Sequence, residues 1–110
     1  MYKLIFYVPE NYAENVKTAV FDTGAGKIGD YDQCCWQVLG QGQFRPLQGS
    51  TPFIGSTPTT DTEAALERVE EYRIEMVCHD KHIQFAVAAM KEGAIDYMAK
   101  PFAPEVLLNM

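Results

Sequence analysis

Two stripes of apolar residues at helical spacing, separated by strand-like segments, constrain the fold of this chain more than any other feature. The first stripe runs up to Thr23 and consists of Tyr12, Val16, Ala19 and Val20. The second ends at Gly93 and consists of Ile83, Ala86, Val87 and Met90. Apolar residues three or four positions apart share one face of an α-helix. The sequence therefore predicts two amphipathic helices that bury one face each.

Characteristic residues mark the ends of both helices. Pro9 fixes a φ angle that suits a helix start, and Gly24 suits the position just after a helix end. Asp80 can cap the second helix with its carboxylate. We therefore expect the helices close to residues 12–23 and 83–93.

Four segments have the composition or alternation of β-strands. Residues 2–8 are aromatic or aliphatic apart from Lys3, which is typical of a central strand buried on both faces. Residues 34–39 and 94–99 suit short strands, and residues 41–46 are expected to continue extended after the first of these. Residues 72–78 alternate with the period of a strand. With the helices in place, the order is β-α-β-β-α-β. It predicts an α+β, ferredoxin-like split β-α-β sandwich, with two helices on one face of an antiparallel sheet.

The remaining segments read as connections within one domain. Gly and Pro punctuate residues 47–58, which predicts an ordered loop or short hairpin. Residues 64–68 can add a helical turn, and Pro101 is expected to end strand pairing. No linker divides the chain, so residues 1–110 are expected to form a single domain.

Length and composition exclude several classes of protein. A chain of 110 residues can bury one core without cross-links. The net charge of -6 disfavours nucleic acid and anionic membranes, which attract an excess of Lys and Arg. The odd number of cysteines suits a reducing compartment, and the apolar N-terminal run is too short for a signal peptide or a membrane span. We expect a cytoplasmic protein without a cofactor.

A glycine-rich segment between the first helix and the second strand is a candidate ligand site. Gly24, Gly26 and Gly29 would let backbone N–H groups approach an anion, and Lys27 adds positive charge. The segment follows a helix and enters a strand, which is the wrong order for a dinucleotide fingerprint. A plain helix-to-strand turn explains the same residues. We group these four residues with Arg45 as the candidate small-ligand site.

The end of the third strand carries a candidate metal site. Cys78, His79 and His82 offer a thiolate and two imidazoles, which are ligands for zinc or copper. Solvent-exposed histidines beside a capping Asp80 explain the same residues without a metal. Metal binding is therefore an alternative hypothesis.

Three aromatic residues are candidates for a subunit interface. Trp36, Phe44 and Phe53 lie in or near the second strand and the loop that follows it. Aromatic side chains are enriched in interfaces, and a long strand at the edge of a sheet has to be covered. We expect self-association through this strand.

Several blocks of the sequence resemble a known family. The segment from Gly24 to Cys34 is followed by GQFRPLQG at residues 42–49, PFIG at residues 52–55 and VEEYRIE at residues 69–75. These blocks resemble the YqfO-type domain, which occurs alone in bacteria or inserted in Nif-three-like proteins, the type 2 GTP cyclohydrolase homologues. The resemblance spans residues 1–78. It implies a fold similar to PII and CutA proteins, which build trimers by packing their sheets together. The metal ligands of the Nif-three-like family lie outside this domain, so the resemblance brings none to this chain.

The C-terminal segment departs from that family. From Ile83 to Leu108 it resembles the end of a response-regulator receiver domain, with KEGA at residues 91–94, Asp96-Tyr97 and Lys100-Pro101-Phe102. A receiver also needs an acidic pair after its first strand and an acceptor Asp, and neither is evident. The segment 79–110 therefore suggests a natural or engineered chimera that does not accept a phosphoryl group.

Residue types that act together in catalysis are not apparent, so we expect a protein that is not an enzyme. The leading hypothesis is an oligomeric interaction or small-ligand regulatory module similar to PII and CutA proteins, with a trimer favoured. The alternatives are the metal-binding protein and a chimera without selected activity.

Overall fold

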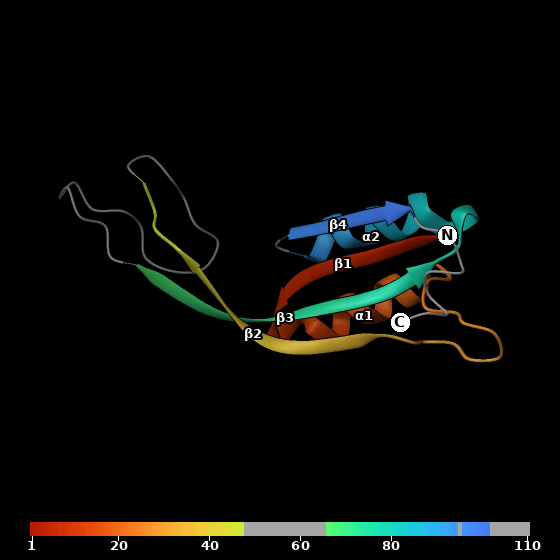
Figure 1. Cartoon of the computed structure of the whole chain (residues 1–110), viewed down its shortest axis with the longest axis horizontal. Coiled ribbons are helices and arrows are strands. Elements are labelled where there is room, and N and C mark those ends of the chain that lie inside the picture. The colour runs from red at the N-terminus through yellow and green to blue at the C-terminus, as the bar shows by residue number, and fades with distance from the viewer. Residues whose placement is uncertain (48–65, 95, 102–110) are drawn as a thin grey trace.

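The computed structural model describes residues 1–47, 66–94 and 96–101. Their elements are β1 (Tyr2–Pro9), η1 (Glu10–Tyr12), α1 (Ala13–Phe21), β2 (Trp36–Phe44), β3 (Glu67–Cys78), η2 (Asp80–His82), α2 (Ile83–Gly93) and β4 (Asp96–Pro101), as Figure 1 shows. This is the predicted order β-α-β-β-α-β, with a short 3-10 turn before each helix.

The four strands form one sheet in the order β2-β3-β1-β4, and every neighbouring pair is antiparallel. Tyr2 of β1 lies opposite Cys78 of β3 on one side and opposite Pro101 of β4 on the other. This is the strand order of a ferredoxin-like split β-α-β sandwich, so the predicted fold class is confirmed.

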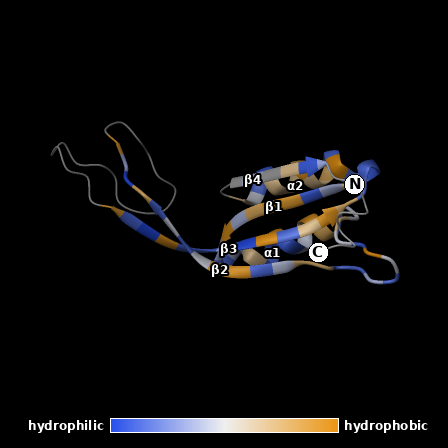
Figure 2. Cartoon of the chain, in the orientation of Figure 1, coloured by the Kyte–Doolittle hydropathy of each residue, from blue (hydrophilic) through white to orange (hydrophobic). Residues whose placement is uncertain are grey.

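Both helices lie on the same face of the sheet, and the core lies between the two layers (Figure 1). The buried cluster takes one alternating row from each central strand and one stripe from each helix. It consists of Leu4, Phe6, Val8, Ala13, Val16, Val20, Ala25, Ile74, Met76, Cys78, Ala86 and Met90. Figure 2 shows this pattern as hydrophobic colour along β1 and along the part of β3 beside it.

One predicted helix end is confirmed and one predicted cap is wrong. Gly24 has a φ of +103° and donates its N–H to the carbonyl of Phe21 at 2.9 Å, so it closes the end of α1 as expected. Asp80 does not act as a side-chain cap, because it is already the first residue of η2. His79 has the cap position instead, and its Nδ1 accepts from the N–H of Lys81 at 3.3 Å.

The bounds of β2, β3 and β4 differ from the prediction. β2 begins at Trp36 and continues to Phe44, into the segment expected to be extended. β3 begins at Glu67, so a helical turn over residues 64–68 is wrong at residues 67 and 68. Antiparallel pairing supplies the backbone hydrogen bonds there and overrides helix propensity. Pro101 belongs to β4, opposite Tyr2, because an edge strand tolerates a missing N–H group. Apart from Leu47, the predicted loop at residues 47–58 lies outside the described residues.

The hairpin of β2 and β3 is longer than the rest of the sheet. β1 pairs with β3 only between Glu71 and Cys78. Residues 41–44 and 67–70 therefore pair only with each other within the sheet, and we call them the hairpin arm. Figure 1 shows the arm running away from the helices.

Candidate functional site

The face of the sheet opposite the helices carries a partly exposed apolar surface. Side chains alternate along each strand, so Ile5 and Val77 point away from the helix-covered core. Both are nevertheless 6% exposed, because their neighbours on this face cover them. Trp36 and Val38 share this face and are 58% and 43% exposed. We call this surface the open face.

Three charged side chains on the open face lie close together. Lys3 Nζ lies 2.8 Å from Glu75 Oε1, and Arg73 Nε lies 3.8 Å from Glu75 Oε2. These three residues lie on the two central strands, where Glu75 is directly opposite Trp36 and Arg73 is directly opposite Val38. Glu75 therefore compensates part of the positive charge of its two neighbours, which lowers the cost of covering this face.

The predicted interface residues lie on two different parts of β2. Trp36 opens the strand on the open face, opposite Glu75, whereas Phe44 ends the strand in the hairpin arm and is half-buried. β2 is an edge strand, and among the described strands only β3 pairs with it. Phe53 lies outside the described residues.

The glycine-rich segment forms a tight connection whose N–H groups are partly used within the chain. Gly24, Gly26 and Gly29 all have positive φ angles, of +103°, +85° and +56°. The N–H of Gly26 donates to the carbonyl of Val77 at 2.7 Å, and the N–H of Ile28 donates to that of Tyr31 at 2.9 Å. With the N–H of Gly24, which donates to the carbonyl of Phe21, at least three amides of the segment bond to the protein and not to an anion, which favours the turn over the anion site.

The structure does not bring all five candidate ligand residues together. Lys27 is exposed in the glycine-rich segment, before β2 begins. Arg45 follows Phe44 at the other end of that nine-residue strand and is also exposed. A strand of this length spans about 30 Å. Arg45 is therefore not part of a single-chain site with the glycines.

The candidate metal ligands have other partners. The Cys78 side chain is 1% exposed and its Sγ contacts the carbonyl of His79 at 3.5 Å. Burial raises the pKa of the Cys78 thiol, and the charge of Asp80 adds to this effect, so the thiolate that a metal requires is disfavoured. His79 serves as the cap of η2. No group of three His, Cys, Asp or Glu among the described residues could hold a metal ion.

The same end of the sheet joins the two candidate sites that the sequence placed apart. The ring of His82 packs over Gly24, because a Cβ atom on Gly24 would lie 2.8 Å from His82 Cδ2. At the same end, Asp80 accepts a hydrogen bond from the N-terminal amine of Met1, which lowers the pKa of that carboxyl. Contacts between residues so distant in sequence leave no signal in a single chain's pattern.

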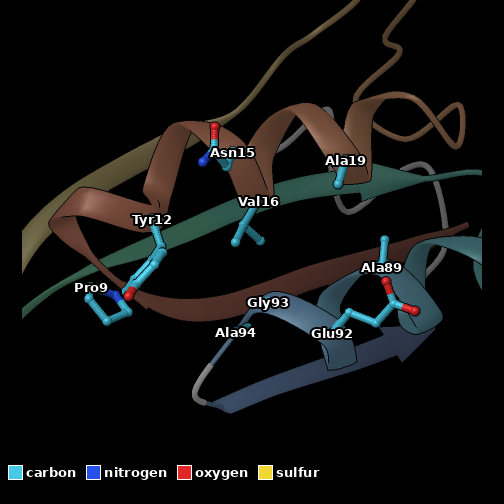
Figure 3. Close-up of a pocket in the computed structure, with 9 residues that line it drawn as sticks. All are labelled: Pro9, Tyr12, Asn15, Val16, Ala19, Ala89, Glu92, Gly93 and Ala94. Carbon is cyan, nitrogen blue, oxygen red and sulfur yellow. The ribbon is translucent and has the colours of Figure 1, made fainter. Parts of the chain in front are cut away.

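Between the two helices lies a groove that sequence reasoning missed. It has a volume of about 600 Å³ (Figure 3). Its lining comes from the end of β1, from one side of α1 and from the last turns of α2: Pro9, Tyr12, Asn15, Val16, Ala19, Ala89, Glu92, Gly93 and Ala94. The sequence signal that could have found it is the run of Ala and Gly near residues 89–94, which leaves space between two packed helices.

No protein-family profile matches the chain, but individual proteins do. The GTP cyclohydrolase 1 type 2 homologue of Mycobacterium tuberculosis is 44% identical over 89 residues, which is 81% of this chain and 22% of that protein. The Mycobacterium leprae homologue is 42% identical over 103 residues, covering 88% of this chain and 25% of that protein. A solved Bacillus cereus protein related to NIF3 covers 92% of this chain with a TM-score of 0.71 and 31% identity. The chain is homologous to one segment of the Nif-three-like proteins. The predicted resemblance is thereby confirmed, although this chain spans only about a quarter of those relatives.

Two more distant structures show the fold alone. The periplasmic divalent cation tolerance protein CutA of Archaeoglobus fulgidus has a TM-score of 0.58 at 13% identity, over 97% of this chain and 92% of its own. Bacillus subtilis GlnK has a TM-score of 0.53 at 12% identity, over 93% of this chain and 84% of its own. The PII/CutA-like architecture predicted from the resemblance is therefore present.

These matches give no support to a chimera. Residues 1–78 make up about seven tenths of the chain, whereas the two mycobacterial homologues and the Bacillus cereus structure match 81% to 92% of it. The likeness therefore continues into the segment after Cys78. β4 also runs antiparallel to β1, as the ferredoxin-like order requires.

Among the described helices none is long and apolar enough to cross a membrane.

Proposed function

We propose that this chain is a non-catalytic regulatory module that self-associates, with further copies of the same chain covering its open face. The observation that carries the proposal is the exposure of Trp36 and Val38 beside Ile5 and Val77, on the face that no helix covers. Apolar and aromatic side chains grouped on one face of a small domain are characteristic of an interaction site.

A second copy suits this surface better than a charged partner. In the Lys3–Glu75–Arg73 group Glu75 contacts both cations, so the group keeps a single net positive charge and does not make this face a strongly charged surface. The outer edge of β2 and the hairpin arm can accept a neighbouring strand by backbone hydrogen bonding. An isolated two-stranded ribbon is only marginally stable in water, so contacts with a second copy would stabilise the hairpin arm. The resemblance to PII and CutA proteins makes a trimer the expected assembly.

The absence of an enzymatic activity is part of this proposal. The names of the relatives refer to proteins about four times as long as this chain, so their activity is not assigned to this segment. A regulatory module needs a surface for its ligand and a surface for its partners, and the groove between α1 and α2 and the open face are the candidates for these two roles.

The test is the solution mass by size exclusion with light scattering over a hundredfold range of concentration. We expect a concentration-independent trimer for the native chain and a lower mass for Trp36→Ala or Val38→Lys. Phe85→Ala is the matched control, because Phe85 is 56% exposed on α2, away from the open face. A native chain that stays monomeric at every concentration, or a Trp36→Ala variant with the native mass, would contradict the proposal.

A further inference from the structure

The groove between α1 and α2 lies beside a close contact between the two helices. A Cβ atom on Gly93 would lie 2.6 Å from Val16 Cγ2, so only glycine allows α2 to approach α1 this closely. Along the rest of the groove the facing residues are Ala19, Ala89 and Ala94, whose side chains are too small to fill the space. In Figure 3, Val16 and Ala19 point from α1 towards α2 across this space. The groove follows from side-chain size, within a well-packed domain.

The walls of the groove have the chemistry of a ligand site. Its volume of about 600 Å³ lies within the usual range of about 300–1,000 Å³ for small-molecule sites. The floor is apolar, and one end is closed by Pro9 and by the aromatic ring of Tyr12, which is 48% exposed. An apolar floor with a few polar groups at its edge is the arrangement that binds organic ligands.

The charge of the groove is negative. Glu92 is the one charged residue among those that line it, and no basic residue is among them. Lys91 is exposed on the same helix and is not part of the lining. The last turn of α2, which ends at Gly93, adds the negative end of a helix dipole. At the start of α1, the carboxylate of Glu14 offsets the positive end of that helix's dipole. Its Oε1 atom also lies 3.1 Å from Lys17 Nζ.

We propose that this groove binds a small organic ammonium ion. The ammonium group lies at Glu92 and the C-terminal end of α2, and the hydrocarbon part lies on the alanine floor towards Tyr12. A carboxylate attracts the cation directly, and an aromatic ring adds a favourable interaction with a cation or with its methyl and methylene groups. An anionic ligand would meet Glu92 without a compensating basic residue in the lining.

This site is independent of the proposed self-association. The groove lies on the helix side of the domain, whereas the open face lies on the other side of the sheet. Loss of ligand binding and loss of assembly are therefore measured separately, by titration and by solution mass.

The test is a titration of the full chain with phenethylamine, followed by backbone amide chemical shifts. 2-Phenylethanol and 3-phenylpropionate are the neutral and anionic probes of similar size. We expect saturable shifts that centre on residues 89–94, with affinity in the order amine, alcohol, carboxylate. Equal affinity for the amine and the carboxylate, shifts centred elsewhere, or no saturable shifts would overturn the proposal.

Three variants identify the groups responsible. Glu92→Gln should weaken binding of the amine by about two- to fivefold, as expected for a partly exposed ion pair, and leave the alcohol unchanged. Glu70→Gln is the matched control, because it removes the same charge from the exposed arm. Ala89→Leu should fill the groove and abolish saturation, with far-ultraviolet circular dichroism showing that the fold is intact. Equal loss in Glu92→Gln and Glu70→Gln would mean that net charge alone attracts the amine, and it would refute the site.

Discussion

The substitution Gly26→Ala tests how the glycine-rich segment holds the end of the sheet. Gly26 is buried and has a φ of +85°, a region that L-residues adopt at a cost. A Cβ atom there would lie 2.7 Å from Phe21 Cε1 and 3.1 Å from the carbonyl oxygen of Cys34. The backbone cannot move aside freely, because Gly26 donates to Val77 and accepts from the N–H of Cys34 at 2.8 Å.

The expected loss is the sum of two costs and one gain. The positive φ costs about 1–2 kcal/mol for a residue with a side chain. Forcing a methyl group into an occupied space costs about 1–3 kcal/mol. The reduced entropy of the unfolded chain returns about 0.4–1 kcal/mol. The free energy of unfolding of Gly26→Ala should therefore fall by about 3 kcal/mol, within a range of about 1–5 kcal/mol, which is a large share of the total for a domain of this size.

Gly29→Ala is the matched control within the same segment. Gly29 also has a positive φ, of +56°, but a Cβ atom there would meet nothing within 4 Å. The backbone cost and the entropic gain nearly cancel, so the loss should be about 0.5–1 kcal/mol. The difference between the two variants isolates the contact with Phe21 and Cys34.

Urea unfolding followed by far-ultraviolet circular dichroism provides the measurement. Both variants are compared with the native chain at one protein concentration, because association adds to apparent stability. In a thermal scan, Gly26→Ala should lower Tm by roughly 10–20 °C. Equal losses for the two variants would refute the reasoning, since they would mean that the methyl group at Gly26 meets no resistance.

Two further predictions concern the cysteine and histidine residues near η2. Cys78 should react with a thiol reagent far more slowly than the exposed Cys35. Because the folded pKa of Cys78 lies above its unfolded value of 9.0, the contribution of Cys78 to stability should be constant below pH 9 and fall above it, so the fall in stability above pH 9 should be smaller in Cys78→Ala. Cys35 labelled no faster than Cys78, or an unchanged pH profile in Cys78→Ala, would contradict this. We also expect that calorimetry shows no stoichiometric zinc binding to the native chain. Stoichiometric binding that the double variant His79→Ala, His82→Ala loses would restore the metal hypothesis.

The sequence predicts the parts of the fold in which local pattern and tertiary packing agree. The alternation at residues 72–78 continues into the observed β3, and the apolar stripe of α2 supplies Ala86 and Met90 to the core. These elements can be predicted because the residues that follow the period of a strand or helix are also the residues that the core buries. The strand order then follows from the order of the elements and from the requirement that both helices cover one face.

The sequence predicts only one half of the hairpin arm. Residues 41–44 are extended as expected, whereas their pairing with residues 67–70 of β3 is not predicted, because it depends on a partner distant in sequence. Gly40 and Gly42 lie opposite Glu71 and Val69 in this ladder. A Cβ atom on Gly42 would lie 2.9 Å from Glu71 Oε1, so the glycine leaves room for a side chain from the partner strand. The tendency of residues 64–68 to form a helix is overridden for the same reason.

In the candidate sites too, the sequence predicts local backbone geometry but not contacts between residues that are distant in sequence. Gly24, Gly26 and Gly29 were identified as residues with special backbone geometry, and their positive φ angles follow from that property. Their partners were not identifiable, because the contact of Gly24 with His82 joins residues 58 positions apart. The groove is even harder to predict from the sequence, because its lining depends on how α1 and α2 approach each other.

The two proposed surfaces share one strand, and this makes their relation testable. Tyr7 lies in the row of Arg73 and Val38 on the open face, and two residues later Pro9 lines the groove. The proposed ammonium site and the proposed assembly surface therefore both include residues of β1, although they lie on different sides of the sheet. If the assembled chain binds the amine more tightly than the monomer does, linkage requires the amine to strengthen assembly by the same factor. Light scattering with and without saturating phenethylamine measures that factor directly, and an unchanged mass distribution at a concentration where monomer and assembly coexist would show that the two surfaces act independently.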